Sequence, residues 1–269
     1  MFKAIGKWRS SVFISLFLTI VLISAGHALA DDVAEKGRTI VEKNEAAIVT
    51  VKIVLEQRMV YEGTERNKSE EKLEAVGTVI DPSGLTVLSL AASDPSSAFK
   101  HMMDMEGMSI ESEITDLKIR TGDGTEHKSK VVLRDKDLDL MFVRPEEPAE
   151  KPFATVDLKT ATTPKILDEI VMVHRLGKVA GWTESAQAGR IHAIITKPRV
   201  LYIPGEDVEL GAPVFGLNGN VIGLVTLKTS KTKASFSMSQ GMGSMGMLPV
   251  ILPAGDILEV AGQIEAPAK

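Results

Sequence analysis

The sequence contains no cysteine and few aromatic residues. Among its 269 residues there are two tryptophans, two tyrosines and eight phenylalanines. The lack of cysteine excludes disulfides, thiolate metal sites and a cysteine nucleophile. A chain of this length can be stable without disulfides, because it buries a large fraction of its surface on folding.

Basic residues are outnumbered by acidic ones, 31 to 36, which gives a formal net charge of -5. The first thirty residues contain Lys3, Lys7 and Arg9 but no carboxylate, so a chain without them has 28 basic and 36 acidic residues and a net charge of -8. Such a surface repels phosphate backbones. Nucleic acid is therefore not an expected partner.

Long apolar runs are absent except at the N-terminus. Basic residues extend to Arg9, an apolar run covers Val12 to Ser24, and small residues at Ala28 and Ala30 precede Asp31. This order predicts a secretory signal peptide that is cleaved after Ala30. A retained membrane anchor is the alternative, but the run is shorter than the roughly 18 to 20 residues of a spanning helix. We expect a periplasmic or secreted protein with no stable membrane span after cleavage.

The sequence after residue 31 predicts mainly short strands. Residues 32–44 are mostly charged, with a few apolar residues between them, and this pattern favours a helix. A closing helix is predicted at 253–264. Between them, short runs rich in valine and isoleucine alternate with Gly, Pro and Asn turns, a pattern typical of barrels or sandwiches. The polar interval at 62–71 separates the first two runs. The expected strands cover residues 47–55, 74–80, 85–90, 114–120, 128–134, 138–144, 169–174, 188–196, 199–203, 213–217 and 221–228.

A cluster of proline and charge divides the strands into two halves. Pro145, Pro148 and Pro152 interrupt the pattern among four charged residues, so we expect a linker there. The predicted organisation is a signal peptide at 1–30, a helical segment at 31–48, an N-terminal barrel at 49–150 and a C-terminal barrel with a closing helix at 151–269.

Four stretches, in the same order, resemble the protease domain of HtrA-type trypsin-like serine proteases. Residues 74–92, EAVGTVIDPSGLTVLSLAA, resemble the strand, turn and strand that lead to the catalytic histidine. Residues 134–143, RDKDLDLMFV, resemble the segment of the catalytic aspartate, and residues 167–193 the opening strands of the second barrel. Residues 211–226, GAPVFGLNGNVIGLVT, resemble the segment that follows the nucleophile. The resemblance implies an all-β, two-barrel chymotrypsin-like fold, and it leaves no room for a PDZ domain after Val260.

Carried over by this resemblance, the catalytic triad is incomplete. The histidine position falls on Ala91, the aspartate position on Asp139 and the serine position on Leu210. Acyl transfer by this template needs a hydroxyl nucleophile, an imidazole that takes its proton and a carboxylate that orients the imidazole. Two of these three groups are missing, so Asp139 is also open to a purely structural interpretation.

The oxyanion loop of the family also changes here. Val208 stands at the position of a glycine whose backbone N–H would donate to the oxyanion, and Ala212 replaces a second glycine. Because a β-branched residue resists glycine-like backbone angles, we expect a loop that no longer holds a tetrahedral intermediate.

A relocated triad is the enzymatic alternative. The resemblance implies an active-site cleft between the two barrels, and it maps three histidines away from that cleft: His127, His174 and His192. His101 is then the nearest imidazole, and Ser237 or Ser239 could supply a substitute hydroxyl. Catalytic groups need placement within roughly half an ångström, which makes such a rescue demanding.

Methionine is concentrated in two short segments. Clusters of thioethers can bind Cu(I), here together with His101. They can also form an adaptable apolar surface that binds a peptide. A third interpretation is that the segments are flexible loops, because Gly/Ser-rich sequence is generally flexible. We expect both segments to border the cleft. The segments contain Met102, Met103, Met105 and Met108, and Met238, Met242, Met245 and Met247.

These observations favour an exported, catalytically inactive relative of trypsin-like proteases that binds a protein or peptide. The alternatives are an active serine endopeptidase with displaced residues and a methionine-rich Cu(I) protein. No cofactor is expected. HtrA-type relatives form trimers through their N-terminal segment, so the resemblance implies a possible homo-oligomer through residues 32–44.

Overall fold

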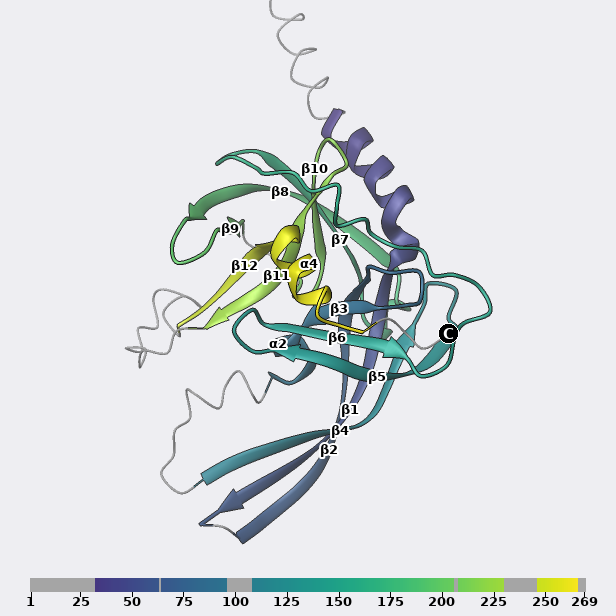
Figure 1. The fold of residues 1–269 in the computed structure, drawn as a ribbon, viewed down its shortest axis with the longest axis vertical. Helices are drawn as coiled ribbons and strands as arrows, with labels where there is room; N and C mark the ends of the chain where they lie inside the picture. Colours follow the sequence, from purple (N-terminus) through teal and green to yellow (C-terminus); the bar gives the residue numbers. More distant parts are fainter. Residues whose placement is uncertain (1–31, 63, 96–107, 206–207, 230–245, 266–269) are drawn as a thin grey trace, which may run out of the picture.

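Two groups of six antiparallel strands dominate the computed structural model, which describes residues 32–62, 64–95, 108–205, 208–229 and 246–265 (Figure 1). Each group closes into a barrel, in the order β1-β2-β3-β6-β5-β4 for the first and β10-β11-β12-β9-β8-β7 for the second. The all-β, two-barrel fold expected from the sequence is confirmed. The strands are β1 (Ile48–Tyr61), β2 (Thr64–Val79), β3 (Thr86–Ser89), β4 (Met108–Arg120), β5 (Glu126–Asp135), β6 (Leu140–Pro145), β7 (Glu169–Arg175), β8 (Glu184–Ile195), β9 (Leu201–Pro204), β10 (Pro213–Gly216), β11 (Val221–Thr229) and β12 (Met247–Pro253).

Helices occur at both ends of the described chain, as predicted. The first covers residues 32–44 and continues into the 3-10 turn η1 (Glu45–Ala47), where the Asn44 side chain donates to the carbonyl of Ile40 at 2.8 Å. The last, α4 (Ala254–Ala261), follows β12 and buries Ile257 and Val260. Two further short helical turns are α2 (Leu90–Ser93) and η2 (Lys178–Ala180).

The core of the first barrel follows the two-residue period of its strands. Val49, Val51, Ile53 and Leu55 alternate along β1 and share one buried cluster. Successive side chains of a strand point to opposite faces, so these four point into the barrel.

Strand β6 is buried on both faces. Met141 and Val143 belong to the cluster inside the first barrel, whereas Leu140 and Phe142 belong to the cluster that includes the core of the second barrel. This double burial explains the unbroken apolar run in the sequence, and it makes β6 a structural link between the barrels.

One polar stretch was predicted wrongly. Residues 62–71 were expected to separate two strands, but β2 begins at Thr64 and pairs with β1 from Tyr61 to Ile48. Together with the first half of β4, this hairpin extends beyond the barrel as a three-stranded arm (Figure 1). Strands that are solvated on both faces lack the apolar alternation on which the prediction depended.

A loop of the second barrel docks on the outside of the first. The indole Nε1 of Trp182 and the backbone N–H of Lys178 donate to the two oxygens of Glu74, each at 3.0 Å. The Arg120 guanidinium lies 4.1 Å from the centre of the Trp182 ring. This contact joins strands β2 and β4 to the β7–β8 loop.

Arg175 forms a buried polar contact between the barrels. Its side chain is only 6% exposed, and it donates to the carbonyl of Ile48 at 2.6 Å, to that of Glu45 at 3.0 Å and to that of Trp182 at 3.3 Å. A guanidinium from β7 thus satisfies carbonyls at the start of the first barrel.

Within the described part of the chain, no helix has the length and apolar character needed to cross a bilayer. The predicted signal peptide, residues 1–30, lies outside the described residues.

Replacing Arg175 with methionine should lower the free energy of unfolding by about 3 kcal/mol, because buried carbonyls would lose charged donors. Urea unfolding followed by circular dichroism measures the change. Arg199→Met, at an exposed position, is the control and should shift the free energy by less than about 0.5 kcal/mol. Equal effects of the two substitutions would show that the Arg175 contact contributes little.

Candidate functional site

The position expected for a catalytic histidine, Ala91, lies in a helical turn directly after β3. Strand β3 ends at Ser89, whose side chain caps α2 by accepting from the N–H of Ala92 at 3.2 Å. The N–H of Leu90 donates to the Asp139 carbonyl at 3.0 Å. Ala91 is therefore held against Asp139 in the second position of α2, and it is 8% exposed.

Asp139 is the central polar residue of this region. It lies in the turn before β6, with a left-handed backbone at φ 59°, and it is 8% exposed. Its Oδ1 accepts from the Ala91 N–H at 2.7 Å. Its Oδ2 accepts from the Ser89 hydroxyl at 2.6 Å and from the Leu227 N–H at 2.7 Å. Since Leu227 belongs to β11, one carboxylate joins the two barrels.

Burial raises the pKa of the Asp139 carboxyl from 3.8 to about 6, although its three hydrogen bonds act in the opposite direction. Desolvation disfavours the charged form of a carboxyl group, whereas donors favour it. The Asp139 carboxyl therefore gains its proton near pH 6, whereas a carboxyl with an ordinary pKa of 3.8 would still be ionised there.

The loop that carries Leu210 also touches the first barrel. Gly211 has φ 85°, and a Cβ atom there would lie 2.3 Å from the carbonyl oxygen of Val76 and 3.3 Å from the Ser89 nitrogen. Thr78 Oγ1 donates to the Gly211 carbonyl at 3.3 Å. Only glycine fits so close an approach with this backbone angle. The contact brings the Leu210 loop next to the strand that leads into Ala91.

The remaining positions of this loop have ordinary conformations. Val208 is partly buried against the core and is not among the described residues with positive φ. Ala212 is fully buried, and its carbonyl accepts from the Val225 N–H at 3.0 Å. Val208 and Ala212, which stand where the family pattern has glycine, thus adopt backbone conformations that do not require glycine, whereas Gly211 keeps a left-handed one.

The described histidines lie elsewhere, as the sequence predicts. His127 is in β5, with its ring 5.0 Å from that of Phe153. His174 is buried in β7, where desolvation lowers its pKa, and its Nδ1 has no partner in the described structure. His192 is in β8. The alternative that depends on His101 lies outside the described residues.

The methionine segments fall largely outside the described residues, so their predicted convergence stays a prediction. The backbone of Met108 begins β4, and Met247 is 5% exposed at the start of β12. Asp94 precedes residues 96–107 and Thr229 precedes residues 230–245, both of which lie outside the described residues, and Asp94 and Thr229 line the same pocket. The other six, Met102, Met103, Met105, Met238, Met242 and Met245, are not described.

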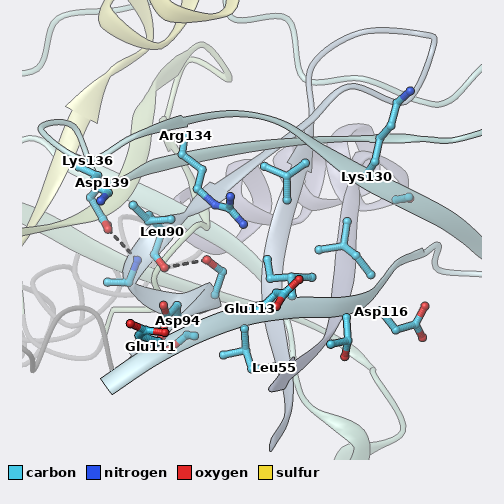
Figure 2. A pocket seen from close by; sticks show the side chains of 18 of the residues that line it. Leu55, Leu90, Asp94, Glu111, Glu113, Asp116, Lys130, Arg134, Lys136 and Asp139 are labelled. Carbon is cyan, nitrogen blue, oxygen red and sulfur yellow. Dashed lines mark hydrogen bonds between the residues drawn. The ribbon is translucent and has the colours of Figure 1, made fainter. Parts of the chain in front are cut away.

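That pocket, of about 1100 Å³, opens beside Asp139 (Figure 2). It extends from Ala91 and Leu227 along the space between β4 and β5. Its lining combines apolar side chains with charges of both signs, and Figure 2 shows Arg134 reaching from β5 into the space above β4. Sequence reasoning missed these wall residues, because lysines and arginines along a strand are typical of any solvated face.

Within the part of the chain that the structure describes, no group of three or more His, Cys, Asp or Glu residues could hold a metal ion. The Cu(I) hypothesis depends on methionine sulfur and is not addressed by this observation. The groups that the described site offers are a buried carboxylate, backbone donors and the mixed pocket wall.

Two six-stranded antiparallel barrels that meet around a buried aspartate define the class of chymotrypsin-like folds. The model of the trypsin-like peptidase domain family matches residues 21–224. The chain belongs to this family. A comparison with curated proteins finds no match.

The raised pKa makes the Asp139 contribution to stability depend on pH. The folded state keeps the proton up to about pH 6 and the unfolded state loses it near 3.8, so stability contributed by this group falls as pH rises through that window. We expect the free energy of unfolding of the wild type, minus that of Asp139→Asn, to fall by about 2 kcal/mol between about pH 4 and 7. Urea titrations across the range measure it. A difference that stays constant would mean that Asp139 titrates normally.

Proposed function

We propose that the protein is a non-catalytic member of the trypsin-like family that binds peptides in the pocket beside Asp139. The observation that carries this proposal is the environment of the carboxylate. Where the template requires an imidazole, the chain has the methyl group of Ala91, and both carboxylate oxygens already accept hydrogen bonds. A histidine partner is replaced by backbone and hydroxyl donors.

At the described positions Ala91 and Leu210, the groups that would react in hydrolysis are missing. Leu210 cannot attack a carbonyl, and Ala91 cannot accept a proton. The Ser89 hydroxyl is fully buried and donates to Asp139, so it is not an available nucleophile. Asp139 thus acts through structure, because it fixes α2 and β11 relative to each other.

Binding requires an open site, and the pocket provides one. It is contiguous with the former catalytic position at Ala91 and is lined by Leu55, Leu90 and Ile114 as well as by charged groups. Charged and polar lining residues outnumber apolar ones, unlike the mainly apolar pockets of small-molecule sites, so a polypeptide suits this pocket better than a compact apolar ligand.

The setting of this function is also part of the proposal. The N-terminal sequence favours export, so the proposed setting is the periplasm or the outside of the cell. Partner peptides or proteins would be met there, and the helix at residues 32–44 is available for homo-oligomer formation.

The purified protein should neither cleave unfolded casein nor react with a fluorophosphonate probe. The double variant Ala91→His with Leu210→Ser should also remain inactive, because Val208 and Ala212 still replace the glycines of the oxyanion loop. Gel-based cleavage and probe labelling measure both. Casein cleavage by the wild type that disappears in Asp139→Ala would establish the displaced-triad enzyme instead.

Peptide binding should depend on the pocket mouth. Thr229 is exposed and lines the pocket, so Thr229→Trp should fill its entrance and reduce capture of short peptides on a random-sequence array. Ala186→Trp, exposed on β8 of the other barrel, is the control and should leave capture unchanged. Undiminished capture by Thr229→Trp would place binding elsewhere on the molecule.

A further inference from the structure

Residues 165–168 form a tight turn before β7. The Asp168 N–H donates to the Lys165 carbonyl at 3.1 Å, and Asp168 Oδ2 accepts from the Lys165 N–H at 2.8 Å. The two central residues of the turn are Ile166 and Leu167. Leu167 has φ 73°, which is close to the angle of the third residue in a type II turn, where glycine or asparagine is usual. A leucine at this position is therefore unexpected.

The left-handed backbone of Leu167 is held by its neighbours. Its N–H donates to the Ile191 carbonyl at 2.8 Å, and its own carbonyl accepts from Arg190 Nη1 at 3.1 Å. A Cβ atom raises the energy of this conformation, because it crowds the following carbonyl. Glycine would adopt the same backbone without that penalty.

Packing within the chain does not compensate for the leucine. Leu167 is 63% exposed, and Ile166 beside it is 55% exposed. Asp139 and Trp182 also have a left-handed backbone, but their side chains make the contacts between the barrels described above. Backbone strain that no internal contact explains is a sign of function. The two exposed aliphatic side chains therefore indicate a contact with another molecule.

A third exposed aliphatic residue lies toward the same end of the second barrel. Strands β7 and β8 are antiparallel, and Glu169 at the start of β7 pairs with Arg190 in β8. The 165–168 turn is thus on the side toward which β8 runs. The connection from β8 to β9, residues 196–200, follows at that end (Figure 1). Val200 in this connection is 41% exposed.

Basic residues predominate around these side chains. Burial and the charge of Asp256 raise the pKa of Tyr202 in β9, so Asp256 is also near this end. It brings the acidic residues to three against four basic ones. This end is therefore basic, although the chain as a whole has a formal net charge of -5. The other charged residues of segments 164–170 and 190–201 are the basic Lys165, Arg190, Lys197 and Arg199 and the acidic Asp168 and Glu169.

Protruding aliphatic side chains beside cations suit a lipid surface. No residue of the two segments lines the pocket beside Asp139, so that pocket offers these side chains no groove. Aliphatic side chains can enter the acyl boundary of a bilayer, while lysine and arginine stay among the headgroups and are attracted by anionic lipids. Charges more than roughly 10 Å away are largely screened at about 0.1 M salt, so the local balance outweighs the net charge of the chain.

We propose that this end of the second barrel docks on an anionic lipid bilayer. The three exposed aliphatic side chains enter the acyl boundary, while Lys165, Lys197 and Arg199 lie among the headgroups. Residues 165–168 and 196–200 are named the docking surface. The inference goes beyond the proposed peptide binding and does not depend on it, because the pocket beside Asp139 is lined by other residues.

Co-sedimentation with lipid vesicles tests the proposal. The protein is recovered after export, so that all variants have the same N-terminus. It should bind vesicles of phosphatidylcholine mixed with phosphatidylglycerol and should not bind vesicles of phosphatidylcholine alone, because the cations need anionic headgroups. Equal binding to both would overturn the anionic surface. Binding to neither would overturn lipid docking in favour of a protein partner that presents an apolar cavity.

The apolar contribution is tested with a matched pair of variants. Ile166→Ser with Leu167→Gly should lower the vesicle partition coefficient by about tenfold or more, because two aliphatic side chains no longer enter the bilayer. Leu176→Ser with Val179→Ser removes two exposed aliphatic side chains just after the other end of β7, and it should leave the coefficient unchanged. Equal losses in the two variants would overturn the assignment of the docking surface.

The basic contribution has its own pair of variants. Lys197→Glu with Arg199→Glu should lower binding to the anionic vesicles by about tenfold or more, because two attractions become repulsions. Arg38→Glu with Lys43→Glu makes the same change in net charge at exposed positions of the helix 32–44, and it should have little effect. Equal effects would show that only the net charge of the chain matters, which contradicts the proposal.

Leu167→Gly alone separates a binding role from a structural one. Glycine relieves the left-handed backbone, so the thermal midpoint should rise by about 1 to 3 °C while vesicle binding falls. Differential scanning calorimetry and co-sedimentation of the same sample measure the two effects. A midpoint that falls would show that the leucine is kept for packing within the chain, and it would overturn the inference.

Discussion

The Asp139 carboxylate is the contact on which the site depends. It is removed from water, its backbone is left-handed, and three donors from three different elements converge on its two oxygens. A buried carboxylate without such donors would cost several kcal/mol. The carboxylate therefore fixes the positions of three elements relative to one another. These are the first turn of α2, the end of β3 and strand β11, which all meet at this side chain.

The same contact fixes one end of the pocket. Ala91 and Leu227 donate to the carboxylate and also line the opening, so the position of the opening is tied to the junction between the barrels. The other end is set by β4, which leaves the barrel to join the projecting arm. The opening therefore lies between the junction of the barrels and a strand that continues beyond the first barrel.

Much of the fold could be predicted from local sequence, and the walls of the site could not. Strand β6 could be predicted from an unbroken apolar run, because its leucine, phenylalanine and valine side chains are buried on both faces of the strand. The structure joins Ala91 and Asp139, two positions that the family motifs single out, by a hydrogen bond of 2.7 Å from the Ala91 N–H to Asp139 Oδ1. The outer half of β2 was missed because it is solvated on both faces, whereas its inner part was predicted at 74–80. The charged pocket wall was missed because its residues come from strands that are distant in the sequence, and strand pairing is not visible in a linear sequence.

The contacts of two arginines have a consequence for the order of assembly. Arg175 donates to the carbonyl of Glu45, which is 130 residues earlier, and Arg144 donates to the carbonyl of Glu265, which is 121 residues later, at 3.0 Å. The first barrel therefore receives neighbours from both the start of the second half and the last described residues. Contacts of such long sequence separation slow folding, because chain entropy is lost before they form. The N-terminal half thus acquires its complete set of neighbours only after nearly the whole polypeptide has been synthesised, so cotranslational maturation of this half is incomplete until the C-terminal helix emerges.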